Sequence, residues 1–316
     1  MPRAVRHRVV AVAGASALLV SACAKSANSG AQSSMPEPEL PAKMITVQVV
    51  ASDPKTYTIT AKGVGLPAPD ADGTEVFKVA VGDAEVPYAG KKVRGELSQS
   101  EGAWRLDNLW PADATMAAAT TEAVQLLKRD AVELGRKAFR SVGDLLPPFA
   151  LYNQDGAIVR PETLRGRKLV IDFVFTRCGN ANMCPANTLR MAKLQRMVKA
   201  AKLDNVTFVT ISFDPDHDTP GVLRQYADSY GLDPENFQLL TGPAEEISPL
   251  LEQFGILTRQ ENGTIVHTMA TLLVSPEGRI VHRMDGDMWQ EDDFLERLQP
   301  VVNGTAKPPP GISNQP

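Results

Sequence analysis

The chain has 316 residues, of which 43% are hydrophobic and 22% are charged, and its formal net charge is −4. This length suffices for about two domains with packed cores, and the composition excludes wholesale disorder. Nucleic-acid binding is also excluded, because neutralising phosphates requires clustered Lys and Arg, and this mildly acidic chain has no basic stripe.

Residues 1–22 are predicted to be a lipoprotein signal peptide. Arginines near the start precede an apolar run at 9–20 that is too short to span a membrane. Small residues then precede Cys23, which resembles the bacterial lipobox, where the cysteine carries the lipid. The alternative is an ordinary secretory signal with an incidental cysteine. We expect a protein of the cell envelope that faces the periplasm and is anchored to the inner or outer membrane by a lipid on Cys23.

A tether and a small β-rich domain are predicted to follow. Residues 23–43 are rich in Ser, Ala, Asn and Pro, which is typical of a flexible tether. Residues 44–111 contain five short alternating segments separated by Gly, Pro and Asp, which predicts an all-β barrel or sandwich. Because this domain contains no Cys or His, we interpret it as a spacer or a partner-binding module without a metal.

A linker helix is predicted within residues 112–142, with Gly143 as its stop. Its expected packing face is the stripe Val124, Leu127, Ala131, Leu134 and Ala138. This face is expected to pack on a neighbouring element; a dimer seam is the alternative.

Residues 143–302 alternate between strands and helices, which predicts an α/β domain with a mixed sheet. A hairpin turns at Asp155-Gly156, and 169–175 is a buried strand. The remaining strands are expected at 206–212, 237–240, 267–275 and 279–284, and the helices at 185–201, 220–230, 243–254 and 290–298. Residues 303–316 are predicted to be a disordered tail.

The loop between the buried strand and the next helix carries the main chemical signal. It contains Cys178 and Cys184, and Pro185 opens the helix, where proline is favoured. Since a helix N-terminus favours a thiolate, we expect Cys184 to be the more acidic thiol and Cys178 the more exposed one. Such a pair can form a disulfide or chelate a soft metal, but not both at once.

His267 opens a predicted strand that should run beside the cysteine-bearing strand. Two thiolates and one imidazole form a soft set suited to Cu(I), and the imidazole also serves Cu(II). The alternatives are a plain disulfide between Cys178 and Cys184, a structural histidine at 267, and a zinc ion. A structural zinc site requires four protein ligands.

Four motifs in this half of the chain resemble the Sco/SenC family of copper chaperones. In chain order they are FTRCGNANMCP, ISFDPDHDTPGVLRQYADSYG, QLLTG and IVHTMATLLVSPEGRIVHRMDGDMW. The resemblance covers about residues 143–300. It implies a thioredoxin-like fold, copper bound by Cys178, Cys184 and His267, and a role in metallating the CuA site of cytochrome c oxidase. Five residues separate the cysteines here, whereas the commonest family spacing is three.

The segment DPDHDTP contributes further candidates. Asp214, Pro215, Asp218, Thr219 and Pro220 match the family's pattern. From the residues themselves we expect Asp218 or Thr219 to cap a helix that Pro220 begins. His217 is either an additional copper ligand or a surface histidine.

Two functions follow as hypotheses. The first is a copper chaperone without turnover, whose partner is a copper-accepting oxidase subunit or another cuproprotein. The second is a thiol–disulfide oxidoreductase that reduces a partner's cysteines before metallation, with Cys178 and Cys184 as its redox-active pair. A peroxidase with the same thioredoxin-like fold is a third hypothesis, and the presence of two paired cysteines counts against it.

Overall fold

The computed structural model describes residues 43–135, 139–261 and 263–299. The predicted signal peptide, Cys23 with nearly all of the predicted tether, and the predicted tail at 303–316 lie outside these ranges. Within them, no helix is both long enough and apolar enough to cross a membrane.

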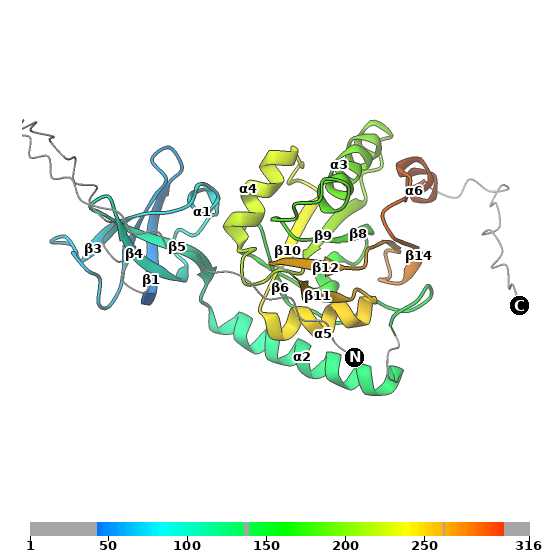
Figure 1. Ribbon diagram of the computed structural model, residues 1–316, viewed down its shortest axis with the longest axis horizontal. Helices are drawn as coiled ribbons and strands as arrows, with labels where there is room; N and C mark the ends of the chain where they lie inside the picture. The colour runs from blue at the N-terminus through cyan, green and yellow to red at the C-terminus, as the bar shows by residue number, and fades with distance from the viewer. Residues whose placement is uncertain (1–42, 136–138, 262, 300–316) are drawn as a thin grey trace, which may run out of the picture. The chain divides into compact units, whose positions relative to one another are not determined.

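The five predicted N-terminal strands are present and close into a barrel (Figure 1), which decides between the barrel and the sandwich. They are β1 Lys43–Asp53, β2 Thr58–Lys62, β3 Thr74–Lys78, β4 Lys92–Ser100 and β5 Ala103–Pro111, in the order β1-β2-β3-β5-β4. Alternate residues of β1 point inward, as the period of two requires, so that Ile45, Val47 and Val49 are buried. A short helix that was not predicted, α1 Val81–Glu85, joins β3 to β4.

The linker helix is α2 Ala114–Leu134, and Asp113 caps it by accepting from the N–H of Met116 at 2.7 Å. The predicted packing stripe was largely wrong. Of its members only Leu127 is buried, and Ala138 is outside the described residues. The buried residues lie nearer the N-terminus (Met116, Ala119, Thr120, Ala123 and Leu127), because α2 packs through its first half, against α5 Ala244–Phe254. The helix ends at Leu134, before the predicted stop.

The second half is the expected thioredoxin-like α/β domain, built on a seven-stranded mixed sheet of order β14-β13-β8-β9-β10-β6-β7. The strands are β6 Leu151–Asn153, β7 Ile158–Val159, β8 Lys168–Val174, β9 Val206–Ser212, β10 Phe237–Thr241, β13 Ala270–Val274 and β14 Ile280–Asp285. Strands β8, β9 and β10 are parallel, and the β13–β14 hairpin joins β8 antiparallel. The expected hairpin at Asp155-Gly156 is β6–β7.

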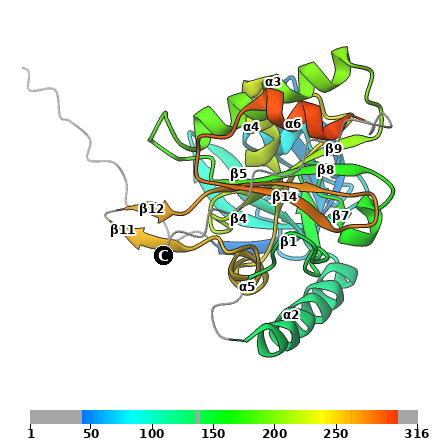
Figure 2. The ribbon, with the colours of Figure 1, turned by 90° about the vertical axis from the view of Figure 1, so that its right-hand side faces the viewer.

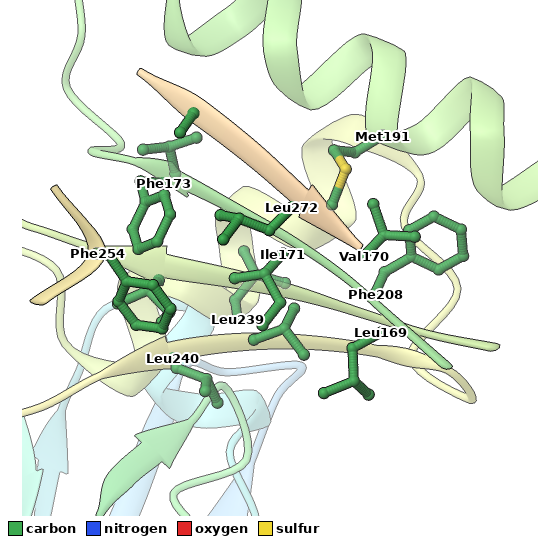
Figure 3. Close-up of a cluster of buried hydrophobic side chains, with 14 of the residues drawn as sticks. Leu169, Val170, Ile171, Phe173, Met191, Phe208, Leu239, Leu240, Phe254 and Leu272 are labelled. Atoms are coloured by element: carbon green, nitrogen blue, oxygen red, sulfur yellow. The ribbon is translucent and has the colours of Figure 1, made fainter. Parts of the chain in front are cut away.

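Helices cover both faces of this sheet. They are α3 Cys184–Ala200, α4 Pro220–Tyr230, α5 and α6 Glu291–Leu298, with a 3₁₀ turn at Pro161–Leu164. Figures 1 and 2 show α3, α4 and α6 on one face and α5 with α2 on the other. Side chains from β8 pack against both helical layers (Figure 3), and Met191 of α3 and Phe254 of α5 are both fully buried. The interior strand β8 is thereby packed on both of its faces, and the cysteine loop follows it directly.

One strand prediction near the expected site needs correction. The predicted strand 267–275 is two strands, β12 Thr264–His267 and β13 Ala270–Val274. Strand β12 pairs with β11 Thr258–Glu261 in a separate two-stranded ribbon, so His267 does not lie in the main sheet. Only the part from Ala270 onward runs beside β8, and its register pairs Leu272 with Ile171.

Candidate metal centre

The cysteine loop connects the end of β8 to the start of α3, as expected. Helix α3 begins at Cys184 with Pro185 in its first turn. Cys184 is completely buried, whereas Cys178 is partly exposed, and both are free thiols. The prediction that Cys178 is the more exposed of the two is therefore confirmed.

The structure brings Cys178, Cys184 and His267 together. Their ligand atoms, two Sγ and one imidazole nitrogen, all lie within 4.8 Å of one another. The Sγ of Cys184 is 3.6 Å from Nε2 of His267. Three convergent donors of this kind form a soft, low-coordinate set that could hold a metal ion and suits Cu(I).

The tautomer of His267 follows from its second nitrogen. Nδ1 lies 3.0 Å from the carbonyl oxygen of Thr268, which can only accept, so Nδ1 carries the proton. In the neutral ring Nε2 then has its lone pair free, and this is the nitrogen that faces Cys184. Phe175 and Phe213 flank the ring, with centroids 5.8 and 4.5 Å away. The imidazole is thus held in the orientation that a metal ligand needs.

Burial sets the protonation of the group. It lowers the pKa of His267, which keeps the imidazole neutral at neutral pH. It also raises the pKa of the Cys184 thiol well above its usual range. The expectation that the helix N-terminus would make Cys184 the more acidic thiol is not supported, because the loss of solvation outweighs the helix dipole. A metal ion would have to displace this proton.

Two aspartates hold the residues just before Cys178. Asp218 accepts from the N–H of Thr176 at 3.1 Å and from the hydroxyls of Thr176 and Ser212. Asp214, which is buried, accepts two bonds from the guanidinium of Arg177. The cysteine loop is therefore tied to the segment that follows β9.

The other candidates of this segment have structural positions. Thr219 is the cap of α4, since its hydroxyl accepts from the N–H of Val222 at 3.3 Å, and Pro220 is the first residue of the helix. His217 is exposed and is not among the residues in the metal-binding group. Asp218 anchors Thr176 instead of capping the helix.

A pocket of about 720 Å³ adjoins the group. His267, Met183 and Met269 line it, together with the acidic side chains of Asp285 and Asp287. It gives the imidazole side of the group access to solvent, while Cys184 stays covered.

Sequence reasoning did not find Thr176 and Arg177 as anchors of the loop. Their side chains act through aspartates about 40 positions away, and no local pattern predicts that pairing. The available signal was the alternation of Asp in DPDHDTP, whose residues themselves mainly predict a helix cap. The ribbon that carries His267 was missed as well.

The fold and this group define a thioredoxin-like domain with a Cys–Cys–His centre. The family model described as SCO1/SenC matches residues 138–303, which is more than half of the chain. The chain belongs to the SCO1/SenC family.

Named relatives match the same half of the chain. The SCO1 protein homolog of Bacillus subtilis is 34% identical over 143 residues, which cover 44% of this chain and 72% of that protein. A SCO1/SenC family lipoprotein of Bacillus anthracis, of solved structure, is 34% identical with a TM-score of 0.47, covering 51% of this chain and 97% of that one. ScoI of Bradyrhizobium japonicum, solved with copper bound, is 27% identical with a TM-score of 0.42, covering 49% and 98%.

Proposed function

We propose that this protein is a membrane-anchored copper chaperone that delivers copper for assembly of a CuA-type site in a cytochrome c oxidase. The observation that carries the proposal is the convergence of two thiols and one imidazole within 4.8 Å. Membership of the SCO1/SenC family supports copper as the cargo. The copper-accepting partner would be an oxidase subunit or another cuproprotein.

The arrangement suits transfer better than storage. Cys178 is partly exposed and lies on a loop, whereas Cys184 is buried at a helix start and His267 lies beside an open pocket. An acceptor's thiolates can approach from the exposed side and replace the protein's ligands one at a time. Three ligands leave Cu(I) open to a further donor, which lowers the barrier to ligand exchange.

Anaerobic Cu(I) titration of the reduced full chain tests this proposal, with Cys23→Ser present to remove the third thiol. We expect one Cu(I) per chain and ultraviolet absorption from thiolate ligation, both lost in Cys178→Ser and Cys184→Ser. A wild-type protein without a stoichiometric site would refute the chaperone function.

Thiol–disulfide exchange is the second candidate, and the proximity of two free thiols favours it. The Cys178 thiolate would attack a partner disulfide, and Cys184 would then release the reduced partner. Two electrons and two protons pass to the partner, and a Cys178–Cys184 disulfide remains. Reduction of a model disulfide without stoichiometric copper binding would favour this function.

The membrane location is part of the proposal. Lipid on Cys23 would hold the folded part at a bacterial membrane, facing the periplasm. Fractionation of cells that express the wild type and Cys23→Ser tests it: the wild type should sediment with membranes and the variant should not. An equal distribution of both proteins would contradict the lipid anchor.

A further inference from the structure

The contact between α1 of the barrel and α4 leaves no room for a side chain. A Cβ added to Gly82 would lie 1.9 Å from the carbonyl oxygen of Gly221. A Cβ added to Gly221 would lie 2.1 Å from Oδ1 of Asp83, which is itself buried. The two backbones approach this closely because both positions are glycine.

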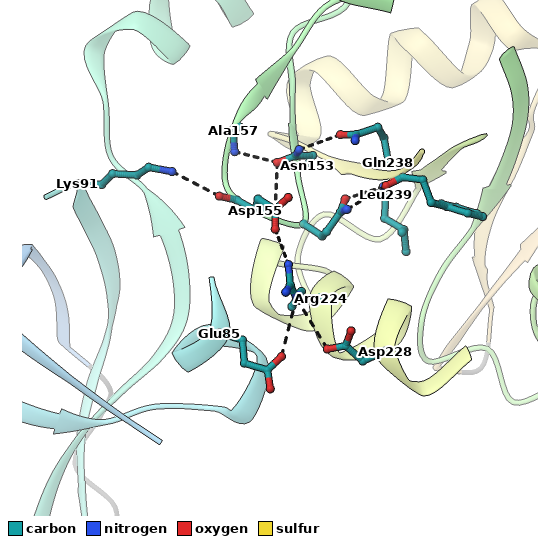
Figure 4. Close-up of polar contacts among 11 residues, drawn as sticks. Glu85, Lys91, Asn153, Asp155, Ala157, Arg224, Asp228, Gln238 and Leu239 are labelled. Atoms are coloured by element: carbon teal, nitrogen blue, oxygen red, sulfur yellow. Dashed lines mark hydrogen bonds and ion pairs between the residues drawn. The ribbon is translucent and has the colours of Figure 1, made fainter. Parts of the chain in front are cut away.

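Close to these glycines in the sequence, α1 and α4 carry charged side chains that approach one another (Figure 4). Nη1 of Arg224 on α4 lies 2.6 Å from the carboxylate of Asp155, and its Nε lies 3.8 Å from Glu85 in α1 and from Asp228. Lys91 of the barrel reaches the carbonyl oxygen of Asp155 at 3.4 Å. Arg224 therefore joins the barrel, the β6–β7 turn and α4 at one point.

The N-terminus of α4 leads directly to the Cys178 side of the metal centre. Gly221 is three positions after Asp218, which accepts two hydrogen bonds from Thr176 and one from Ser212. Asp214 binds Arg177, the residue before Cys178. A shift of the first turn of α4 would therefore move the loop that carries this sulfur.

The same helix also contacts the Cys184 side. The hydroxyl of Thr188 donates to the carbonyl oxygen of Cys184 at 3.0 Å, so it must accept from Tyr226 of α4 at 2.7 Å. Burial raises the pKa of Tyr226, which keeps this phenol protonated as the donor. Helix α4 is thus bonded to the residues that position both sulfurs.

We infer that the barrel clamps α4 through the Gly82–Gly221 contact and thereby sets the distance between Cys178 and Cys184. Gly82, Gly221 and Arg224 are positioning residues of the metal centre. The barrel lies outside residues 138–303, the part that the SCO1/SenC model matches, so the clamp is an addition to the family's domain. The inference rests on the proposed use of the Cys–Cys–His group, and it assigns a role to a domain without metal ligands of its own.

Two variants of the full chain, each in the Cys23→Ser background, test the clamp. Gly82→Ala forces the backbones apart, and Arg224→Ala removes the polar contacts without a backbone clash. For both we expect Cu(I) affinity to fall about 10- to 100-fold, the range for groups that orient metal ligands. The dithiol–disulfide equilibrium constant against glutathione should change in the same variants, because the approach of the two sulfurs sets it. Arg224→Lys should restore part of both values.

The controls separate positioning from general effects. Val64→Ala alters a barrel side chain that is 99% exposed, and Arg129→Ala removes an exposed arginine of α2; both should behave as wild type. Wild-type values of copper affinity and glutathione equilibrium in both Gly82→Ala and Arg224→Ala would overturn the clamp. If Gly82→Ala does not fold, Arg224→Ala decides alone. A wild type that binds no copper refutes the proposed function, yet the glutathione equilibrium still tests the clamp.

Discussion

Cys184 and His267 meet at 3.6 Å although 83 positions separate them in the chain. Cys184 is fixed by the first turn of α3, and His267 ends a ribbon strand that is separate from the main sheet. Because Nδ1 of His267 donates to Thr268, the nitrogen that faces the sulfur is the unprotonated one. This pairing places the unprotonated imidazole nitrogen where a third ligand to a sulfur-bound metal would have to be.

Replacing His267 should therefore weaken copper binding and leave thiol chemistry intact. We expect His267→Ala to lower Cu(I) affinity at least about tenfold, since a ligand contributes no less than the groups that merely orient one. The glutathione equilibrium of Cys178 and Cys184 should stay close to wild type. Competition with a chromophoric Cu(I) chelator measures the affinity. His217→Ala is the matched control, because His217 is exposed and outside the group; equal losses in the two variants would remove His267 from the ligand set.

The two thiols should react at different rates with an alkylating agent. Cys184 is completely buried and burial raises its pKa, whereas Cys178 is partly exposed. Limiting iodoacetamide should therefore modify Cys178 first in the reduced apoprotein, and Cu(I) should protect both residues. Peptide mass spectrometry after timed quenching reads out the order. Faster modification of Cys184 would mean that the helix start is open to solvent.

The anchor of the cysteine loop should contribute to stability as well as to the site. Asp218→Ala removes the oxygens to which the N–H of Thr176 and the hydroxyls of Thr176 and Ser212 donate, so these buried donors lose their acceptors. We expect the free energy of unfolding to fall by about 1–3 kcal/mol, the cost of a buried unsatisfied group. Urea denaturation measures it. Asp216→Ala, at an exposed position of the same segment, should change little, and a similar loss there would point to the removal of charge alone.

Features of the fold and the site could be predicted from the sequence where they depend on neighbouring residues, and not where they depend on tertiary packing. The strand before Cys178 follows from a buried apolar run, and the helix at Cys184 follows from Pro185. The strand and the helix were both predicted correctly. The thiol acidity was not, because the helix start is visible in the sequence whereas the burial that opposes it arises from packing.

The surroundings of His267 show the same limit. Its approach to the sulfurs was expected from an inferred strand in the main sheet, yet the residue belongs to a ribbon. The pair Asn262-Gly263 is the local feature of the sequence that favours a hairpin before His267. The contact between Gly82 and Gly221 had no local signal at all, because each glycine is required by atoms of the other helix.

Titration of Glu246 should make the stability of the protein depend on pH. This carboxyl is completely buried and accepts from the N–H of Ala150. Burial raises its pKa to about 7, while Ala150 and Arg160 oppose the rise and Glu245 adds to it. The folded chain then holds this proton more tightly than the unfolded chain, so the contribution to stability is full below about pH 4.5 and is lost as the pH rises to 7. The loss is on the order of 3 kcal/mol.

Glu246→Gln removes this titration. The free energy of unfolding of the variant minus that of wild type should increase as the pH rises from 5 to 8. This trend is expected whatever the value of the difference at pH 5. Urea midpoints at several pH values measure the trend, and other buried carboxyls contribute equally to both proteins. Glu252→Gln removes a carboxylate at an exposed position of the same helix and should run parallel to wild type. Parallel curves for Glu246→Gln would instead show that this carboxylate is solvated when charged, and hence that the junction of α5 with Ala150 opens to water.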